Sequence, residues 1–139
     1  MSKLMSSPPK SKSRVPTPES SKKPCILCIE ENEELFRQIK GSLENAGYGV
    51  IGTRNSWQAL AFLLKSPFHL VLGGELLTRA DGVELIQKIR KARPDVPIVL
   101  WSRTLPNSMK NLDAFVSAEE SPANLLTLLE KLLRRYAAA

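Results

Sequence analysis

Residues 70–85 read LVLGGELLTRADGVEL, a stretch in which one pattern of apolar residues gives way to another. An apolar run over residues 68–72 ends at two glycines, and helical spacing covers residues 83–92. A short continuous apolar run predicts a buried strand, and apolar residues three and four apart predict an amphipathic helix. The stretch therefore predicts a strand, a glycine-containing loop and a helix in succession.

The same alternation of strand and helix continues in both directions along the chain. Further strands are predicted at residues 25–29, 48–53, 97–101 and 114–116, and further helices at residues 30–46, from 55 or 56 to 66, and from 121 onward. Strands that are apolar on both faces and alternate with helices indicate a parallel sheet between two layers of helices. In such a three-layer α/β/α domain the functional crevice lies at the carboxyl ends of the strands.

The positive charge of the chain is concentrated in residues 1–24. These residues hold six basic side chains and one acidic side chain, so that only +1 of the formal net charge of +6 belongs to the rest. They are rich in Ser, Pro and Lys and poor in bulky apolar groups, which predicts a disordered tail before one folded domain over residues 25–136. The sequence has no signal-peptide core and no bilayer-spanning apolar run, so we expect a cytoplasmic protein.

Cys25 and Cys28 form a C-x-x-C pair, which in a cytosolic protein can be a redox motif. Both residues lie in the apolar run of the first predicted strand, where side chains three positions apart point to opposite faces. We therefore interpret both cysteines as packing residues.

Polar or small residues follow the predicted strands at the carboxyl edge of the sheet. Glu30 and Glu31 follow the first strand, Gly74 the third, Ser102 the fourth and Ala118 the fifth. Adjacent carboxylates suit a hard cation such as Mg²⁺, although two longer Glu side chains without a third carboxylate bind it weakly. The alternative is a pair of solvated carboxylates near a helix N-terminus. We favour that alternative and expect no resident metal and no cofactor.

Four segments together resemble the receiver domain of bacterial response regulators, over about residues 25–135. They are ILCIEENEELFRQIKGSLENAGY (26–48), LVLGGELLTRADGVEL (70–85), VPIVLWS (96–102) and DAFVSAEESPANLLTLL (113–129). The resemblance implies a flavodoxin-like (βα)5 fold with a five-stranded parallel sheet in the order 2-1-3-4-5. Only 12 residues separate Trp101 from Ala114, too few for a helix of average length and two loops. We therefore expect the fourth helix of that fold to be shortened or absent.

The chain departs from the receiver pattern at two positions that matter for chemistry. Gly74 stands where the family has its phosphoacceptor Asp, and Ala118 stands where it has a Lys. Ser102 keeps the hydroxyl position and Phe115 the switch aromatic position. Gly74 offers no nucleophile and Ala118 no cation, so no aspartyl phosphate is expected to form there. Glu75 is one residue too late, and on an extended segment its side chain points to the other side.

The resemblance and its departures predict a pseudo-receiver rather than an enzyme. We expect a phosphorylation-independent interaction module that acts through a protein partner in bacterial two-component-type signal transduction. The alternative is a protein whose basic tail binds nucleic acid or another acidic surface. Nucleic acid is the less favoured partner because the folded part is close to neutral, and no membrane partner is expected.

The last helix carries apolar side chains on more than one side. Its core-facing set is predicted to be Leu125, Leu128, Leu129, Leu132 and Tyr136. Leu126 and Leu133 extend this stripe onto a flank that the sheet is not expected to cover. We predict that these two leucines mark a surface for a partner or for self-association, unless the segment 102–113 folds over them.

Two tryptophans and one histidine are expected to have structural roles. The helix after Asn55 is predicted to pack through Trp57, Leu60, Leu63 and Leu64 on one side. Trp101 is predicted to pack within the fourth strand. His69 is expected at the surface or at a strand edge, because a single His cannot complete a metal site.

Overall fold

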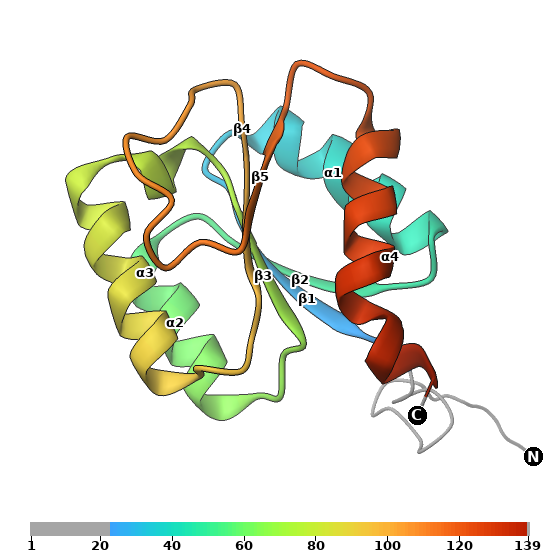
Figure 1. Cartoon of the computed structure of the whole chain (residues 1–139), viewed down its shortest axis with the longest axis horizontal. Coiled ribbons are helices and arrows are strands. Elements are labelled where there is room, and N and C mark those ends of the chain that lie inside the picture. Colours follow the sequence, from blue (N-terminus) through green and yellow to red (C-terminus); the bar gives the residue numbers. More distant parts are fainter. Residues whose placement is uncertain (1–22, 139) are drawn as a thin grey trace, which may run out of the picture.

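The computed structural model describes residues 23–138, with the side chains of residues 23–134. The strands are β1 (Cys25–Ile29), β2 (Gly49–Thr53), β3 (Leu70–Gly73), β4 (Ile98–Ser102) and β5 (Ala114–Ser117). They form one parallel sheet in the order β2-β1-β3-β4-β5. The helices are α1 (Glu33–Asn45), α2 (Ser56–Lys65), α3 (Ala80–Ala92) and α4 (Pro122–Ala138), with a 3-10 turn η3 (Glu75–Thr78) before α3. α2 and α3 cover one face of the sheet, and α1 and α4 the other (Figure 1). The predicted three-layer fold and its strand order are confirmed.

Two capping asparagines and one glycine mark the ends of α1 and α2. The Asn32 side chain accepts a hydrogen bond from the main-chain N–H of Leu35 at the start of α1. Asn55, one of the two predicted caps, does the same for the N–H of Gln58 at the start of α2. Gly47 follows α1 with a φ of +100°, a conformation that glycine adopts without steric cost. The chain therefore turns into β2 where the sequence predicts that it should.

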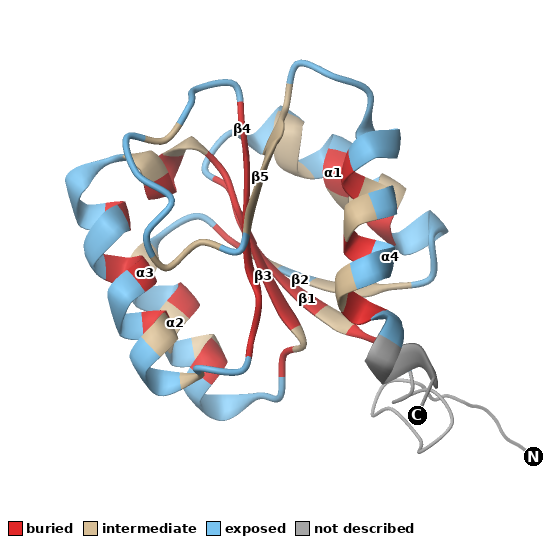
Figure 2. Ribbon diagram, viewed as in Figure 1, coloured by how far each residue is buried: buried red, intermediate tan, exposed pale blue. Residues whose placement is uncertain are grey.

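The core lies on both faces of the sheet, as the buried strands in Figure 2 show. The strand residues beneath α2 and α3 include Leu27, Ile29, Val71, Ile98 and Leu100, and those beneath α1 and α4 include Ile26, Cys28, Leu70, Leu72 and Val99. Successive residues alternate between the two sets, as the period of a strand requires. Burying each such side chain contributes roughly 1.5–3 kcal/mol, so the doubly covered strands β1, β3 and β4 are the centre of stability.

The two cysteines lie on opposite faces of β1, as predicted. Cys25 packs on the α2–α3 side and Cys28 on the α1–α4 side, and both are free thiols. Burial, with a smaller contribution from the charge of Glu30, raises the pKa of the Cys28 thiol to about 12. The N–H of Cys25 donates to Nδ1 of His69 at 3.0 Å, which places this histidine in a structural contact between β1 and the start of β3.

The connection between β4 and β5 contains no helix. Residues 103–113, all within the described part of the chain, form turns and extended backbone instead. The segment lies beside α3 (Figure 1), and residues 106–108 and 110–112 line one wall of an apolar groove with Val83 and Ile86 of that helix. The predicted loss of the fourth helix is confirmed, and a loop takes its place beside α3.

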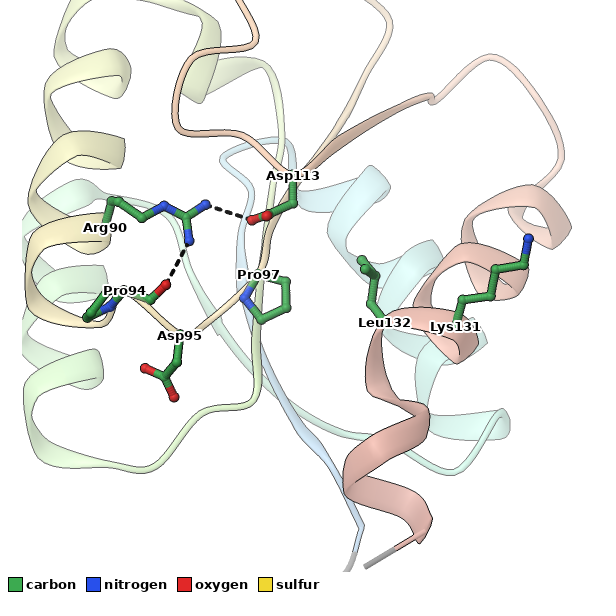
Figure 3. A pocket seen from close by; sticks show the side chains of 7 residues that line it. All are labelled: Arg90, Pro94, Asp95, Pro97, Asp113, Lys131 and Leu132. Carbon is green, nitrogen blue, oxygen red and sulfur yellow. Dashed lines mark hydrogen bonds and ion pairs between the residues drawn. The ribbon is translucent and has the colours of Figure 1, made fainter.

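Arg90 of α3 holds this loop in place. Its guanidinium donates to the main-chain oxygens of Pro94, Val96 and Asn111 at 3.3, 3.1 and 2.8 Å. It also pairs with the carboxylate of Asp113 at 2.7 Å (Figure 3). The same Asp113 oxygen accepts the N–H of Ile98 at 2.7 Å, so the network joins α3, β4 and the residue before β5.

The expected packing of α2 is wrong for two of its four large residues. Leu63 is buried and Leu60 is half-buried, but Trp57 is 85% exposed and Leu64 is 68% exposed. Successive residues of a helix are about 100° apart around its axis. A helix that buries Ala59 and Leu63 against the sheet therefore points Trp57 and Leu64 away from it. Trp101, by contrast, is buried in β4 as predicted.

The predicted interface on the last helix is also wrong in part. Leu133 is 1% exposed and belongs to the core, and Leu126 is half-buried and packs against the same cluster. The buried positions of α4 are Leu125, Leu129 and Leu133, spaced four apart, and the residues before β1 and β2 lie beside Leu133. Leu128 and Leu132, which were predicted to face the core, are half-buried like Leu126. The loop 103–113 does not cover Leu126 and Leu133, because it lies beside α3 on the opposite face of the sheet.

The predicted disordered tail, residues 1–24, lies outside the described residues except for its last two. Within the described part of the chain, no helix has the length and apolar character needed to cross a membrane.

Replacing Arg90 by Ala should loosen the loop that stands in for the missing helix. The substitution removes hydrogen bonds made by a charged group and leaves three carbonyl oxygens and Asp113 without that donor, so we expect a loss of about 1–3 kcal/mol in the free energy of unfolding. Limited proteolysis should cut residues 103–113 faster. Arg37→Ala in α1, an exposed arginine with no ion pair among the described residues, is the control and should change neither quantity. Equal effects of the two substitutions contradict the assigned role of Arg90.

Candidate functional site

The carboxyl ends of β1, β3, β4 and β5 meet at one edge of the sheet, as predicted. The N–H of Gly74 donates to the main-chain oxygen of Ile29 at 2.9 Å, which places the end of β3 beside the end of β1. The N–H of Ala118 donates to the main-chain oxygen of Ser102 at 3.0 Å, which joins the ends of β5 and β4. Glu30, Gly74, Ser102 and Ala118 therefore lie along one edge of the sheet.

The carboxylate of Glu30 occupies the space beside Gly74. Glu30 is only 4% exposed, and its Oε2 accepts the N–H of Asn32 at 2.9 Å. A Cβ atom placed on Gly74 would lie 2.0 Å from Oε1 of Glu30, far inside van der Waals contact. The main chain of Gly74, with φ of −99° and ψ of −154°, is an extended conformation open to any residue type. The backbone therefore does not require glycine here, and a larger residue at position 74 would have to displace the end of the Glu30 side chain.

Burial raises the pKa of Glu30 above its ordinary value, and the charges of Glu75 and Glu31 act in the same direction. The N–H of Asn32 and the charge of Arg103 act in the opposite direction, without cancelling the effect of burial. A carboxyl group in low-dielectric surroundings is costly to ionise, which is why its pKa is raised despite the hydrogen bond from Asn32.

Glu31, the second member of the acidic pair, is separated from the first. It is exposed and forms an ion pair with Arg79, which lies between η3 and α3. Glu30, the other carboxylate of the predicted acidic pair, is buried beside Gly74. Among the described residues, no group of three His, Cys, Asp or Glu side chains is arranged to hold a metal ion. The two carboxylates thus do not jointly present free oxygens to a cation.

Glu75 lies at the same edge, which corrects the expectation that it points away. Its Oε2 accepts the Thr104 hydroxyl at 2.8 Å, and its charge raises the pKa of Glu30. The expectation assumed an extended segment, but residues 75–78 form the 3-10 turn η3, which brings the side chain back toward the end of β4.

The remaining predicted positions are structurally engaged. Ser102 is buried, and its hydroxyl oxygen accepts the N–H of Thr104 at 2.9 Å. Ala118 is half-buried and packs against the core on the α1–α4 side. Phe115 is half-buried and packs against the core beneath α2 and α3. Of the groups that the receiver pattern places here, the Asp and the Lys are absent, and Ser102 and Phe115 are present but contact other residues of the domain.

Sequence reasoning missed three residues of this edge. Asn32 was identifiable in principle, because an Asn three residues before Leu35 is a helix-capping signal. Arg79 and Thr104 carried no such signal, since each meets its acidic partner only through the fold. Their contacts depend on the exact path of the loops after β3 and β4.

The chain belongs to the response regulator receiver domain family, the domain of two-component signal transduction. The model of that family matches residues 26–120. The response regulator receiver protein CpdR of Brucella abortus is 32% identical over 74 residues, covering 53% of this chain and 62% of CpdR. The phosphate regulon transcriptional regulatory protein PhoB of Pseudomonas aeruginosa is 26% identical over 118 residues, covering 79% of this chain and 52% of PhoB. The chain thus spans about half the length of the curated relatives it matches.

A solved structure shows the same fold. The response regulator protein TrrA of Thermotoga maritima, crystallised in complex with Mg²⁺-BeF, superimposes with a TM-score of 0.72 at 23% identity. The match covers 79% of this chain and 99% of that one. This likeness shows the receiver fold over most of the chain.

Replacing Gly74 by Ala should destabilise the domain only while Glu30 is present. Overpacking of this kind typically costs about 1–3 kcal/mol, and Gly74→Ala should cost less than about 0.5 kcal/mol in a Glu30→Ala background. Urea unfolding of the two single variants and the double variant gives the coupling. Gly41→Ala in α1, where an added Cβ meets nothing within 4 Å, should stabilise by about 0.5–1 kcal/mol. If the effects of Gly74→Ala and Glu30→Ala are additive in the double variant, the assigned contact between the two residues is wrong.

The raised pKa of Glu30 predicts a dependence of stability on pH. In the window between the ordinary value of 4.5 and the raised native pKa, the folded protein binds more protons than the unfolded chain, so the Glu30 contribution falls as pH rises. Glu30→Gln keeps the acceptor for the Asn32 N–H but removes this titration. The unfolding free energy of the wild type minus that of Glu30→Gln should therefore decrease from pH 4.5 to pH 7. A constant difference shows that the carboxyl is not desolvated.

Proposed function

We propose that this domain is a phosphorylation-independent receiver, which works as a protein-interaction module in two-component-type signalling and performs no catalytic step. The observation that carries the proposal is the buried Glu30 carboxylate in the space where a side chain at Gly74 would begin. In the receiver pattern that side chain is the phosphoacceptor Asp. Here the place holds a carboxylate that belongs to the neighbouring strand.

The chemistry of the edge supports this proposal. Forming an acyl phosphate needs a carboxylate oxygen aligned on the incoming phosphorus and cations to neutralise the phosphoryl oxygens. Gly74 supplies no oxygen, and Ala118 supplies no charge. Glu30 is hydrogen-bonded to Asn32 and Glu75 to Thr104, so each nearby carboxylate that could act as a substitute has an internal partner.

The shape of the domain supports an interaction role that differs from that of an ordinary receiver. The face formed by the fourth helix, the fifth strand and the last helix is remodelled, because a loop held by Arg90 replaces the helix. A partner that recognises that helix in other receivers finds different chemistry here. We therefore propose that the partner is a protein selected by the remodelled surface rather than by a phosphoryl group.

Incubation with acetyl phosphate and Mg²⁺ should leave the chain unmodified. Intact-mass spectrometry should show the unmodified mass alone, while an active receiver that keeps the Asp and the Lys, treated in parallel, gains one phosphoryl group. A stable adduct on this chain would falsify the proposal.

The variant Gly74→Asp serves as a second arm of that experiment. It should remain poorly labelled, because its Cβ meets the Glu30 carboxylate and Ala118 still lacks a cation. The triple variant Gly74→Asp, Ala118→Lys, Glu30→Asp should be labelled more than the single one, since it restores the acceptor, the cation and the space. Efficient labelling of Gly74→Asp alone shows that the Glu30 carboxylate is no obstacle.

A further inference from the structure

His69 ties the amino end of β3 to the amino end of β1 through two hydrogen bonds. Its main-chain N–H donates to the oxygen of Cys25 at 2.9 Å, and its Nδ1 accepts the N–H of Cys25 at 3.0 Å. In the second bond the acceptor is a side chain and not a main-chain oxygen. The oxygen of the preceding residue, Phe68, accepts instead from the guanidinium of Arg93 at 3.2 Å. The N–H of Cys25 therefore depends on one imidazole ring.

The same corner also joins β1 to β2. The main-chain oxygen of Pro24 accepts the N–H of Gly49 at 2.9 Å, and Pro24 is buried. Pro24 and Cys25 are thus bonded to β2 on one side and to β3 on the other. A change at His69 acts at the point where the chain enters the sheet.

The hydrogen bond from Cys25 fixes the protonation state of the ring. A main-chain N–H can only donate, so Nδ1 of His69 carries a lone pair and no proton. Neutral imidazole has one such acceptor, whereas the charged imidazolium has two donors and no acceptor. When the ring takes up a proton, two N–H groups therefore face each other where this bond is now made.

The surroundings of the ring favour its neutral form. Burial lowers the pKa of His69 below its ordinary value of 6.5, and the charge of Arg93 acts in the same direction. A hydrogen bond with the main chain of Cys25 acts in the opposite direction without cancelling these effects. The ring therefore stays neutral at neutral pH and takes up a proton in weak acid.

The other ionisable groups of this corner do not share that range. Asp95, which follows α3, pairs with Arg93 at 3.8 Å. Lys65 ends α2 and Lys23 precedes β1, and both are exposed. Burial raises the pKa of the Cys25 thiol, which keeps it uncharged where an imidazole titrates. Of these side-chain types, only imidazole has an ordinary pKa between about 5 and 8.

We propose that His69 is a pH-dependent switch, which holds the start of β1 against β3 while its ring is neutral and releases it when the ring is protonated. The released segment includes Pro24, so its contact with β2 loosens as well. The switch involves no phosphoryl group. It goes beyond the proposed function, because labelling by acetyl phosphate does not depend on it and each can fail without the other.

The lowered pKa sets the sign of the effect on stability. The unfolded chain takes up the proton near 6.5, before the folded domain does, so His69 stabilises the domain above that pH. Its contribution is lost as the pH falls through the native pKa. Glu30, at the opposite end of β1, acts with the opposite sign, because its contribution falls as the pH rises. Variants at each residue separate the two titrations.

NMR spectroscopy of the full chain tests the proposal without any substitution. His69 is the single histidine of the sequence, so its ring signals are unique, and they should titrate below 6.5. The protection of the Cys25 amide against hydrogen exchange should fall about tenfold or more as the ring becomes charged, because the donor loses its acceptor. Protection that does not follow the ring titration overturns the proposal, as does a ring that titrates at or above 6.5.

Variants at position 69 separate loss of the acceptor from loss of the titration. His69→Asn places Oδ1 near the position of Nδ1, so it can accept the Cys25 N–H at any pH, and protection should be similar at about pH 5 and about pH 7.5. His69→Ala removes the acceptor, and protection should be low at both. The wild type should resemble the Asn variant at the higher pH and the Ala variant at the lower. Equal pH dependence in the wild type and in His69→Asn overturns the proposal.

A change of charge beside the ring tests whether the two events are coupled. Arg93→Gln removes the charge but keeps an amide that can donate to the Phe68 oxygen. The pKa of the ring and the midpoint of the change in Cys25 protection should rise together, because the charge of Arg93 lowers that pKa. Lys88→Gln, which removes an exposed charge from α3, is the matched control and should move neither. A ring pKa that rises while the Cys25 midpoint stays in place overturns the coupling.

Discussion

The contact between the Glu30 carboxylate and the main chain of Gly74 is the constraint on which the carboxyl edge depends. Parallel pairing brings the ends of β1 and β3 within hydrogen-bonding distance, so that one atom more on residue 74 forces Glu30 to move. Glu30 in turn holds the turn into α1 through the N–H of Asn32, whose side chain caps that helix. Position 74, where the receiver pattern has an acceptor, thus lies against the buried carboxylate of Glu30.

The order of elements was predictable from the sequence because it depends on local patterns. The apolar runs, the cap at Asn55 and the glycine at 47 each act within a few residues, and the structure has them where they were expected. The absence of the helix between β4 and β5 followed from the number of residues alone. The resemblance to the receiver family added the strand order and the positions that meet at the edge.

Angular details were not predictable in the same way. Trp57 and Leu133 were assigned to the wrong environments, because a stripe of leucines on an apolar helix has no sharp edge from which to fix the rotation. That rotation is set by which residues the neighbouring elements cover, as Pro24 and Tyr48 do beside Leu133. Glu75 was misplaced because a 3-10 turn replaced the assumed extended segment. In each case the deciding contact is distant in sequence.

β5 is an edge strand, so the part of the domain that contains it can unfold locally at a lower free energy than the central strands. β5 has a hydrogen-bonded neighbour on one side only, β4, and the four residues of this strand are all half-buried. The loop before it is held through one arginine rather than by a packed helix. Local opening can therefore release β5 and the 103–113 loop while β1, β3 and β4 stay closed, so that residues 103–117 form a weaker cooperative unit of the native state. Any ligand that orders these residues therefore stabilises the whole domain by restricting its local opening.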